Sequence, residues 1–226
     1  PDDLSTPPRT SPTTLPAMSP VLRSAAALGA LVAANVAAGR LITGPLNDLP
    51  AEHRLNHDLR GRGGPPAARL AHAVSHSSDT SRAVGIGVGL TGLLLVRGRR
   101  RAALEPGLAM ALASATHVIS SALVGRPRPA VERLGTKQPT SSFPSGHVGA
   151  MTALAVALDH AGRGLPRPAR VALRAGLVGY LGLLGWSRLY NGQHYASDVL
   201  AGYLNGSLAA LIALRATRPG DEAADA

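Results

Sequence analysis

The chain has 226 residues, a length that fits one large domain or two small ones. Its formal charge is +10, yet 45% of its residues are hydrophobic and only 16% are charged, which excludes a disordered chain. The absence of cysteine excludes a disulfide framework, thiolate chemistry, Cys-ligated zinc and iron–sulfur clusters. Aromatic residues make up 3%, too few for a platform that stacks single-stranded nucleic acid, so we expect no nucleic-acid partner.

The chain divides into a predicted domain and two tails. Residues 1–20 are rich in Pro, Ser and Thr and are predicted to form a flexible tail, and residues 219–226 form an acidic one. Between them, in residues 21–218, lie six apolar stretches bounded by Gly, Pro or Arg clusters: 21–43, 81–96, 102–124, 147–162, 169–189 and 196–216. Since about 20 apolar residues span a bilayer as a helix, the predicted fold is all-α, an integral membrane bundle of about six transmembrane helices. Some stretches are short or carry polar residues such as His117, so a buried soluble bundle is the alternative.

The arginines predict the orientation of this bundle. If the N-terminus is cytoplasmic, the second and fourth connections face inward, and these hold Arg97, Arg99, Arg100, Arg101, Arg163, Arg167, Arg170 and Arg174. An excess of arginine in cytoplasmic loops is typical of membrane proteins and accounts for much of the basic charge. We therefore predict a multi-pass protein of the cell membrane. Arginines in the first connection weaken the asymmetry, although Glu52, Asp58 and Asp79 dilute them.

Regularly spaced glycines favour close helix packing. A first series recurs every three residues and a second forms a GxxxG pair: Gly176, Gly179, Gly182 and Gly185, then Gly202 and Gly206. A GxGxxG run at 87–92 lies within an apolar stretch instead of at a strand-to-helix turn, and is interpreted as helix packing.

Three polar clusters interrupt the apolar pattern, and the predicted topology places all three on the outer face. The first runs from Gly125 to Pro129 and the second from Ser141 to His147. The third comprises Ser187, Arg188, His194 and Asp198.

The first two clusters have features of an anion site. Arg126 and Arg128 carry planar guanidinium groups that suit phosphate oxygens, and the neighbouring prolines restrict their backbone. Ser145 is a candidate N-cap, and Gly146 allows close approach to a helix N-terminus, which attracts anions. Taken singly, the arginines are better explained as interfacial anchors, and His147 as a side chain that snorkels at the start of a capped helix.

The third cluster supplies a candidate nucleophile. His194 and Asp198 are four residues apart, so on a helix they would share one face. The carboxylate could then accept a hydrogen bond from one imidazole nitrogen and leave the other to attack. Two imidazoles, three arginines and a helix N-terminus at one membrane face together indicate phosphoryl transfer.

These residues resemble the three-part signature of the type 2 phosphatidic acid phosphatase (PAP2) superfamily: K-x6-RP, PSGH and SR-x5-H-x3-D. The second part is matched by residues 144–147 and the third by Ser187, Arg188, His194 and Asp198 at full spacing. The first is matched only by Arg128 and Pro129, because Ser121 stands where the family has lysine. Arg126 and Lys137 are the cations near enough in the sequence to compensate.

The resemblance implies a mechanism without metal or cofactor. His194 would attack phosphorus to form a phosphohistidine, with Asp198 fixing its tautomer, and His147 would protonate the leaving oxygen. The non-bridging oxygens would be held by Arg128, Ser145, the Gly146 amide and Arg188.

The expected function is hydrolysis of a lipid-linked phosphate or diphosphate at the outer face, with a polyprenyl diphosphate such as undecaprenyl diphosphate favoured. Phosphatidic acid and phosphatidylglycerol phosphate are alternative substrates. A catalytically weakened lipid-phosphate-binding protein is the non-enzymatic alternative, because of Ser121. Vanadate-dependent haloperoxidases have similar anion-binding residues, but they are generally soluble and much longer.

The i, i+4 pairs His53/His57 and His72/His76 lack a third metal ligand marked by the sequence and are interpreted as a solvated face.

Overall fold

A computed structural model describes residues 19–46, 49–135 and 138–218. Residues 1–18 of the predicted first tail, the whole acidic tail and Lys137 lie outside these ranges.

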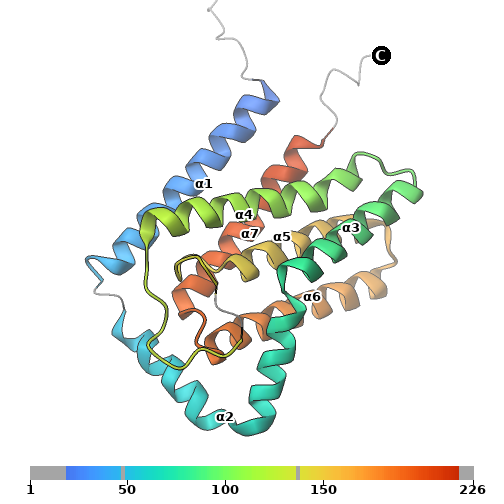
Figure 1. The fold of residues 1–226 in the computed structure, drawn as a ribbon. Helices are drawn as coiled ribbons and strands as arrows, with labels where there is room; N and C mark the ends of the chain where they lie inside the picture. The colour runs from blue at the N-terminus through green and yellow to red at the C-terminus, as the bar shows by residue number, and fades with distance from the viewer. Residues whose placement is uncertain (1–18, 47–48, 136–137, 219–226) are drawn as a thin grey trace, which may run out of the picture.

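The described part of the chain is all-α and contains no strand, as predicted (Figure 1). Each of the six apolar stretches forms a helix with ends close to those expected. The seven α-helices are α1 (Pro20–Thr43), α2 (Pro50–Ser77), α3 (Thr80–Val96), α4 (Glu105–Val124), α5 (Gly146–Ala161), α6 (Arg167–Tyr190) and α7 (Ala196–Ala216).

The predicted count of six membrane spans is not confirmed. Only three helical stretches of the described residues are long and apolar enough to cross a membrane: 21–43, 102–124 and 196–216. Helices α2 and α3, bent by 52° at a short break, would add a fourth if the pair forms one span. Helix α5 has only 16 residues, which is too short to cross a membrane. Helix α6 is long enough but is not apolar enough, because it carries four arginines: Arg167, Arg170, Arg174 and Arg188.

Helix α2 is the one helix that the sequence did not predict. Its composition is polar, and Gly64 has φ 61° and ψ −176° in its middle, directly before Pro65 and Pro66. A positive φ suits glycine, and the prolines lack amide hydrogens for the helical ladder, so the helix bends here. Figure 1 shows α2 folded back at the end of the molecule opposite the C-terminus, and it packs against α6.

Helix α5 lies at the centre of the bundle, where small residues bring it against α7. A Cβ atom at Gly206 would lie 2.2 Å from the Gly149 carbonyl oxygen, and one at Gly202 would lie 2.8 Å from the Ser145 carbonyl oxygen. The GxxxG pair therefore forms the predicted close contact. Of the other series only Gly185 is packed tightly, against Tyr203; no atom lies within 4 Å of a Cβ built at Gly176, Gly179 or Gly182, so packing does not explain these three.

We expect Gly206→Ala to destabilise the bundle. The added methyl meets backbone atoms of α5, which cannot move aside as a side chain could, and such overpacking typically costs about 1–3 kcal/mol. Gly176→Ala is the matched control, because the new methyl has no neighbour and alanine favours a helix. The measurement is the thermal unfolding midpoint in detergent. Equal midpoints for the two variants would contradict the close contact.

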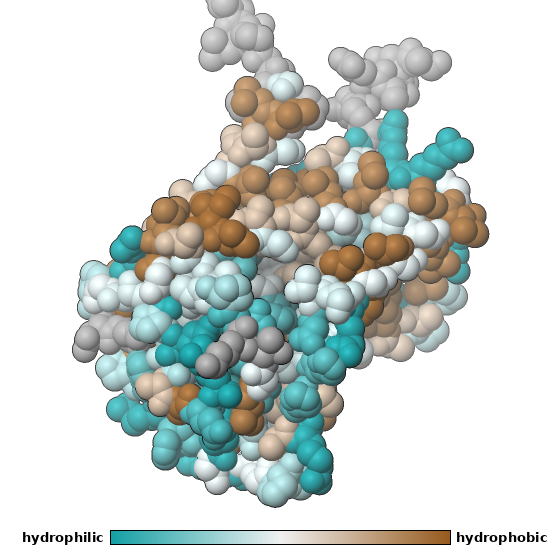
Figure 2. Space-filling model, viewed as in Figure 1, coloured by the Kyte–Doolittle hydropathy of each residue, from teal (hydrophilic) through white to brown (hydrophobic). Residues whose placement is uncertain are grey.

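The surface separates into apolar and polar regions. In Figure 2 hydrophobic residues cover α1, α3 and α4, whereas the end formed by α2 and the connection from α4 to α5 is hydrophilic. Exposed apolar side chains on these helices include Leu41, Val88, Leu95, Ile119 and Leu123. Soluble monomers rarely expose continuous apolar surfaces of this kind, so the soluble bundle is disfavoured and the protein is a membrane protein.

Candidate active site

The topology brings the three polar clusters to one end of the bundle. The first follows the end of α4 and the second opens α5. The third runs from the last turn of α6 through the connection that holds His194 to the first turn of α7. All three contribute to a cavity of about 280 Å³, which is lined among others by Arg128, Gly146, His147 and His194. Residues separated by 66 positions in the chain therefore surround one space, as the sequence predicted.

His194 is buried at this end, and a backbone carbonyl defines its tautomer. Its Nδ1 lies 2.7 Å from the Ser142 carbonyl oxygen and 3.7 Å from the nearer carboxylate oxygen of Asp198. A carbonyl only accepts, so Nδ1 carries the hydrogen and Nε2 of the neutral ring is left with a lone pair. Asp198 is too distant for a hydrogen bond, so the expectation that it fixes the tautomer is corrected.

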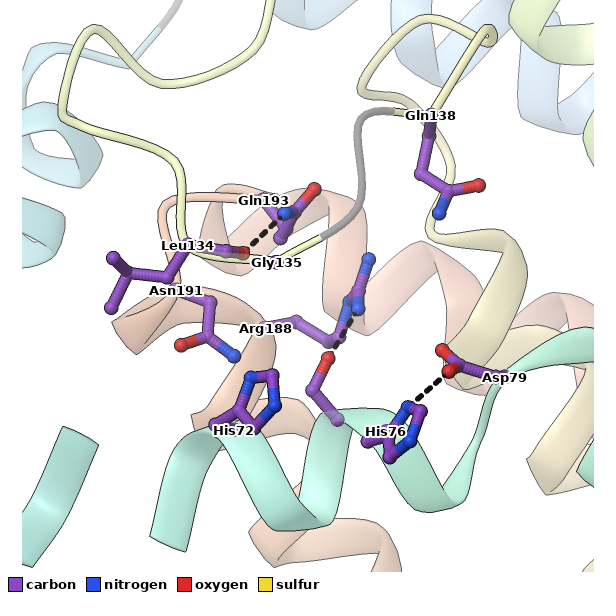
Figure 3. Close-up of a pocket in the computed structure, with 10 residues that line it drawn as sticks. His72, His76, Asp79, Leu134, Gly135, Gln138, Arg188, Asn191 and Gln193 are labelled. Carbon is purple, nitrogen blue, oxygen red and sulfur yellow. Dashed lines mark hydrogen bonds and ion pairs between the residues drawn. The ribbon is translucent and has the colours of Figure 1, made fainter. Parts of the chain in front are cut away.

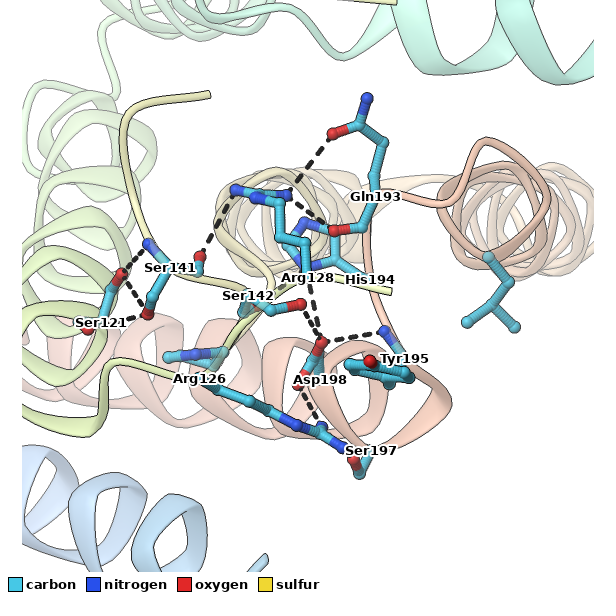
Figure 4. Close-up of polar contacts among 12 residues, drawn as sticks. Ser121, Arg126, Arg128, Ser141, Ser142, Gln193, His194, Tyr195, Ser197 and Asp198 are labelled. Atoms are coloured by element: carbon cyan, nitrogen blue, oxygen red, sulfur yellow. Dashed lines mark hydrogen bonds and ion pairs between the residues drawn. The ribbon is translucent and has the colours of Figure 1, made fainter. Parts of the chain in front are cut away.

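The premise of a shared helical face is also corrected, because α7 begins only at Ala196, after His194. Tyr195 is the N-cap of α7, and its amide donates to Asp198 Oδ2 at 2.8 Å. Asp198 also accepts from the Ser142 hydroxyl at 2.5 Å (Figure 4). The carboxylate thus holds Ser142, whose carbonyl in turn holds His194.

Burial is the main reason that the pKa of His194 is lowered, to about 4. The positive charges of Arg188 and Arg128 lower it further, whereas Asp198 raises it. The imidazole is therefore neutral at physiological pH, which is the form a nucleophile requires.

Arg126 does not present its charge to this cavity. Its guanidinium group is fully buried and donates to Asp198 at 2.6 Å and to Glu52 at 3.0 Å, and it lies over the Tyr195 ring (Figure 4). The interpretation of Arg126 as a substitute for the missing lysine is therefore replaced by a structural one, since two carboxylates already use its charge. Glu52, on α2, was missed because α2 was not predicted.

Arg128 is held in place by backbone carbonyl groups. Its two terminal nitrogens donate to the carbonyls of Gln193, at 2.7 Å, and Thr140, at 3.1 Å. Its Nε is buried without a hydrogen-bond partner. Burial and the nearby Arg133 lower the pKa of Arg128, while Asp198 raises it.

Unpartnered donors also occur on Arg188 and Ser145. Arg188 donates from Nη1 to the Ser75 hydroxyl at 2.6 Å, but its Nε and Nη2 are buried and unpartnered. The hydroxyl of Ser145, the N-cap of α5, is buried and makes no capping hydrogen bond. Leaving buried donors unsatisfied is costly, and an anion would satisfy them. The three side chains expected to hold phosphate oxygens thus each keep a buried polar atom without a partner.

A second, smaller cavity of about 30 Å³ borders Arg188 (Figure 3). His72 and His76 line it from α2, with ring centres 5.8 Å apart, and His76 pairs with Asp79. Both histidines are exposed, as expected of a solvated face. Gln138 lines both cavities, so the two are neighbours.

Ser121, the position of the missing lysine, is buried and faces the connection from α4 to α5. Its hydroxyl accepts from the Ser141 amide at 2.9 Å and lies 2.9 Å from the Ser141 hydroxyl. It does not line the 280 Å³ cavity.

His117 lines that cavity from α4, and the sequence marked it only as a polar residue in an apolar stretch. Its ring lies beside the first residue of α5, where a Cβ at Gly146 would come within 2.8 Å of it. The His117 ring therefore occupies the space beside Gly146, and the approach of an anion to the Gly146 amide stays a prediction.

An all-helical membrane bundle with a cavity lined by arginine and histidine at its polar end defines a class of protein. Within that class, a sequence model of the PAP2 superfamily matches residues 102–219, more than half of the chain. The chain belongs to the PAP2 superfamily. No curated protein matches it.

Two solved structures share the fold. A transmembrane PAP2 type phosphatidylglycerolphosphate phosphatase from Bacillus subtilis is similar over 87% of this chain and 95% of its own, with a TM-score of 0.68 and 20% identity. LpxE of Aquifex aeolicus is similar over 71% of this chain and 93% of its own, with a TM-score of 0.56 and 24% identity. Both likenesses concern the fold, which is that of membrane PAP2 phosphatases.

Proposed function

We propose that this protein hydrolyses a lipid-linked phosphate or diphosphate in the 280 Å³ cavity. The observation that carries the proposal is the set of unpartnered buried donors on Arg128, Ser145 and Arg188, close to a histidine whose Nε2 has a free lone pair. Of these three residues Arg128 lines the cavity itself, Ser145 directly precedes the lining residue Gly146, and Arg188 lines the neighbouring 30 Å³ cavity. Part of the wall of the larger cavity is apolar and includes Ala83, Val84, Met110 and Ala150, from α3, α4 and α5. A phosphate with an attached apolar chain fits this division better than a soluble phosphate does.

In the proposed mechanism His194 Nε2 attacks phosphorus, and the bond to the leaving oxygen breaks. His147 gives a proton to that oxygen, so the lipid product leaves neutral, or as a monophosphate if the substrate is a diphosphate. Water then attacks the phosphohistidine, His147 takes a proton from it, and inorganic phosphate and free His194 are restored. The guanidinium groups of Arg128 and Arg188 hold the non-bridging oxygens, and the mechanism needs no metal ion.

The favoured substrate is a polyprenyl diphosphate such as undecaprenyl diphosphate. Phosphatidylglycerol phosphate is the second candidate, favoured by the similarity to the phosphatidylglycerolphosphate phosphatase of Bacillus subtilis, and phosphatidic acid is the third. A weakened lipid-phosphate-binding protein is the alternative that Ser121 favours.

The test is phosphate release by the detergent-purified protein from these three lipids, with a chelator present. Release from at least one lipid, and none by a His194→Ala variant, is expected. Binding of the lipids without release would favour the weakened binding protein, and release that stops with the chelator would contradict the metal-free mechanism.

We further predict that the cavity faces the extracytoplasmic side of the cell membrane, because arginines gather at the other end of the bundle. The chain has no cysteine, so single cysteines report the side directly. On intact cells an impermeant maleimide should label Arg133→Cys, next to the cavity end, and leave Arg99→Cys and Arg167→Cys unlabelled. Labelling of the last two alone would reverse the orientation.

A further inference from the structure

The cavity contains a third imidazole, which the mechanism above does not use. His117 lies on the apolar helix α4, about two turns before its end, and lines the cavity together with Arg128, His147 and His194. An ionisable side chain on an apolar membrane helix is expensive, and such residues commonly face an internal cavity and mark a functional site. Ala83, Val84 and Met110, on the neighbouring wall, add no charge.

The ring of His117 is held in one orientation. Its Nδ1 lies 2.8 Å from the Pro144 carbonyl oxygen, which only accepts, so Nδ1 carries a hydrogen. Nε2 is therefore the nitrogen with a lone pair when the ring is neutral. A Cβ at Gly146 would lie 2.8 Å from both Nε2 and Cδ2, so this edge of the ring lies against the N-terminus of α5. That N-terminus attracts anions and opens the same cavity.

The position of His117 is related to that of the missing lysine. Ser121 lies one helical turn further along α4, and residues four apart are neighbours on one helix face. Ser121 is bonded to Ser141 and does not line the cavity, whereas His117 does. A positive charge for the bound phosphate can thus come from the same face of the same helix, one turn earlier.

We propose that His117 contacts the substrate phosphate through Nε2 and supplies the cationic contact that Ser121 lacks; this rests on the proposed function and adds a residue to its site. Neutral His117 accepts a hydrogen bond from the P–OH of a monoanionic phosphate. When that proton moves to Nε2, the phosphate becomes a dianion and the ring an imidazolium, and the hydrogen bond becomes an ion pair. Arg128, His147 and His194 are the other charged or titratable groups around this cavity.

Two conservative variants separate this role from a structural one. His117→Asn keeps a donor near Nδ1 for the Pro144 carbonyl but removes Nε2. His117→Gln places its amide near Nε2 and loses the bond to Pro144. His57→Asn, at an exposed position on α2, is the control.

The experiment measures the dissociation constant of inorganic phosphate for each full-length variant in detergent, together with KM and kcat for the lipid that wild type hydrolyses. We expect His117→Asn to weaken phosphate binding roughly tenfold, the effect of one lost charge-assisted hydrogen bond, and to raise KM. His117→Gln should lose less, and His57→Asn should equal wild type. If the ring has only a structural role, Gln is the more damaging change. Unchanged phosphate binding by His117→Asn would overturn the proposal.

The outcomes for the contact and for the proposed function are distinguishable. A wild-type protein that binds phosphate through His117 but hydrolyses no lipid would overturn the phosphatase and support the contact. Hydrolysis by wild type together with normal phosphate binding and KM in His117→Asn would support the phosphatase and overturn the contact. A protein that neither binds phosphate nor hydrolyses a lipid would overturn both. Should the Asn variant not fold, His117→Phe keeps the ring volume without either nitrogen. Phosphate binding weaker than that of His117→Gln, which also lacks the bond to Pro144, supports the contact, and binding equal to that of His117→Gln or of wild type overturns it.

Discussion

His194→Ala is expected to reduce phosphate release to the background rate, a loss on the order of 10⁴-fold or more for an enzyme without its nucleophile. The buried ring, oriented by the Ser142 carbonyl, is the group we assign to attack phosphorus, and no other imidazole in the cavity is held by that carbonyl. The variant should also form no acid-labile phosphoprotein when it is mixed with labelled lipid phosphate and quenched. His147→Ala should instead slow release most for lipids with poor leaving groups.

His57→Ala, on the exposed surface of α2, is the control for loss of a histidine. Near-normal turnover by His194→Ala, with a thermal unfolding midpoint equal to that of wild type, would contradict the nucleophile assignment.

The pH dependence of the reaction follows from the same residue. Because burial lowers the pKa of His194 to about 4, the ring loses its nucleophilic lone pair only as the pH falls toward 4. His194 should therefore cause no loss of kcat/KM between pH 7 and 5, where an exposed histidine would be protonated. The profile should be recorded with a substrate whose phosphate does not titrate in that range. An acid limb of kcat/KM near pH 6.5 that wild type and the His117→Asn variant share would contradict the burial argument.

Arg126→Met is expected to have the largest effect on stability. The buried guanidinium group separates the carboxylates of Asp198 and Glu52, which are themselves 0% and 12% exposed. Removing one partner of a buried ion pair leaves uncompensated charge and costs about 3–5 kcal/mol. Turnover should fall as well, because Asp198 holds Ser142, whose carbonyl orients His194.

The measurements are the thermal unfolding midpoint and phosphate release, with the exposed Arg133→Met as the matched control. Adding Glu52→Gln to Arg126→Met removes one of the two carboxylate charges and should restore part of the stability. If Arg126→Met unfolds at the same temperature as Arg133→Met, the ion pair does not stabilise the fold.

The sequence predicted the helices that are apolar and missed the one that is not. The stretch 21–43 is rich in Ala, Leu and Val, so its hydropathy alone indicated α1. Helix α2 is polar and is interrupted by Gly63, Gly64 and two prolines, which are ordinarily signs of a loop. It is a helix here because its residues pack against α6, and packing between distant segments leaves no local signal.

In the candidate site, too, features that local sequence indicates were predicted, and those that depend on packing between distant segments were not. The spacing of the motifs and their positions at helix ends were enough to predict that Arg128, His147 and His194 meet. The Ser142 carbonyl could not be predicted as the partner of His194, because every residue has a carbonyl and only the fold selects one. The pairing of Arg126 with Glu52, 74 positions apart, likewise depends on α2.

Helix α2 also bears on how small the working protein can be. Its first turn supplies Glu52 to the Arg126–Asp198 pair, and its last turn supplies the Ser75 hydroxyl to Arg188. The bend at Gly64 sets the angle between these two ends, so one helix contacts both Arg126 and Arg188. Yet α2 lies entirely before residue 102, where the match to the superfamily begins. A fragment of residues 102–219 would contain every residue that matches the signature and still lack the partners that α2 supplies to Arg126 and Arg188, so we expect an active fragment to begin no later than α2.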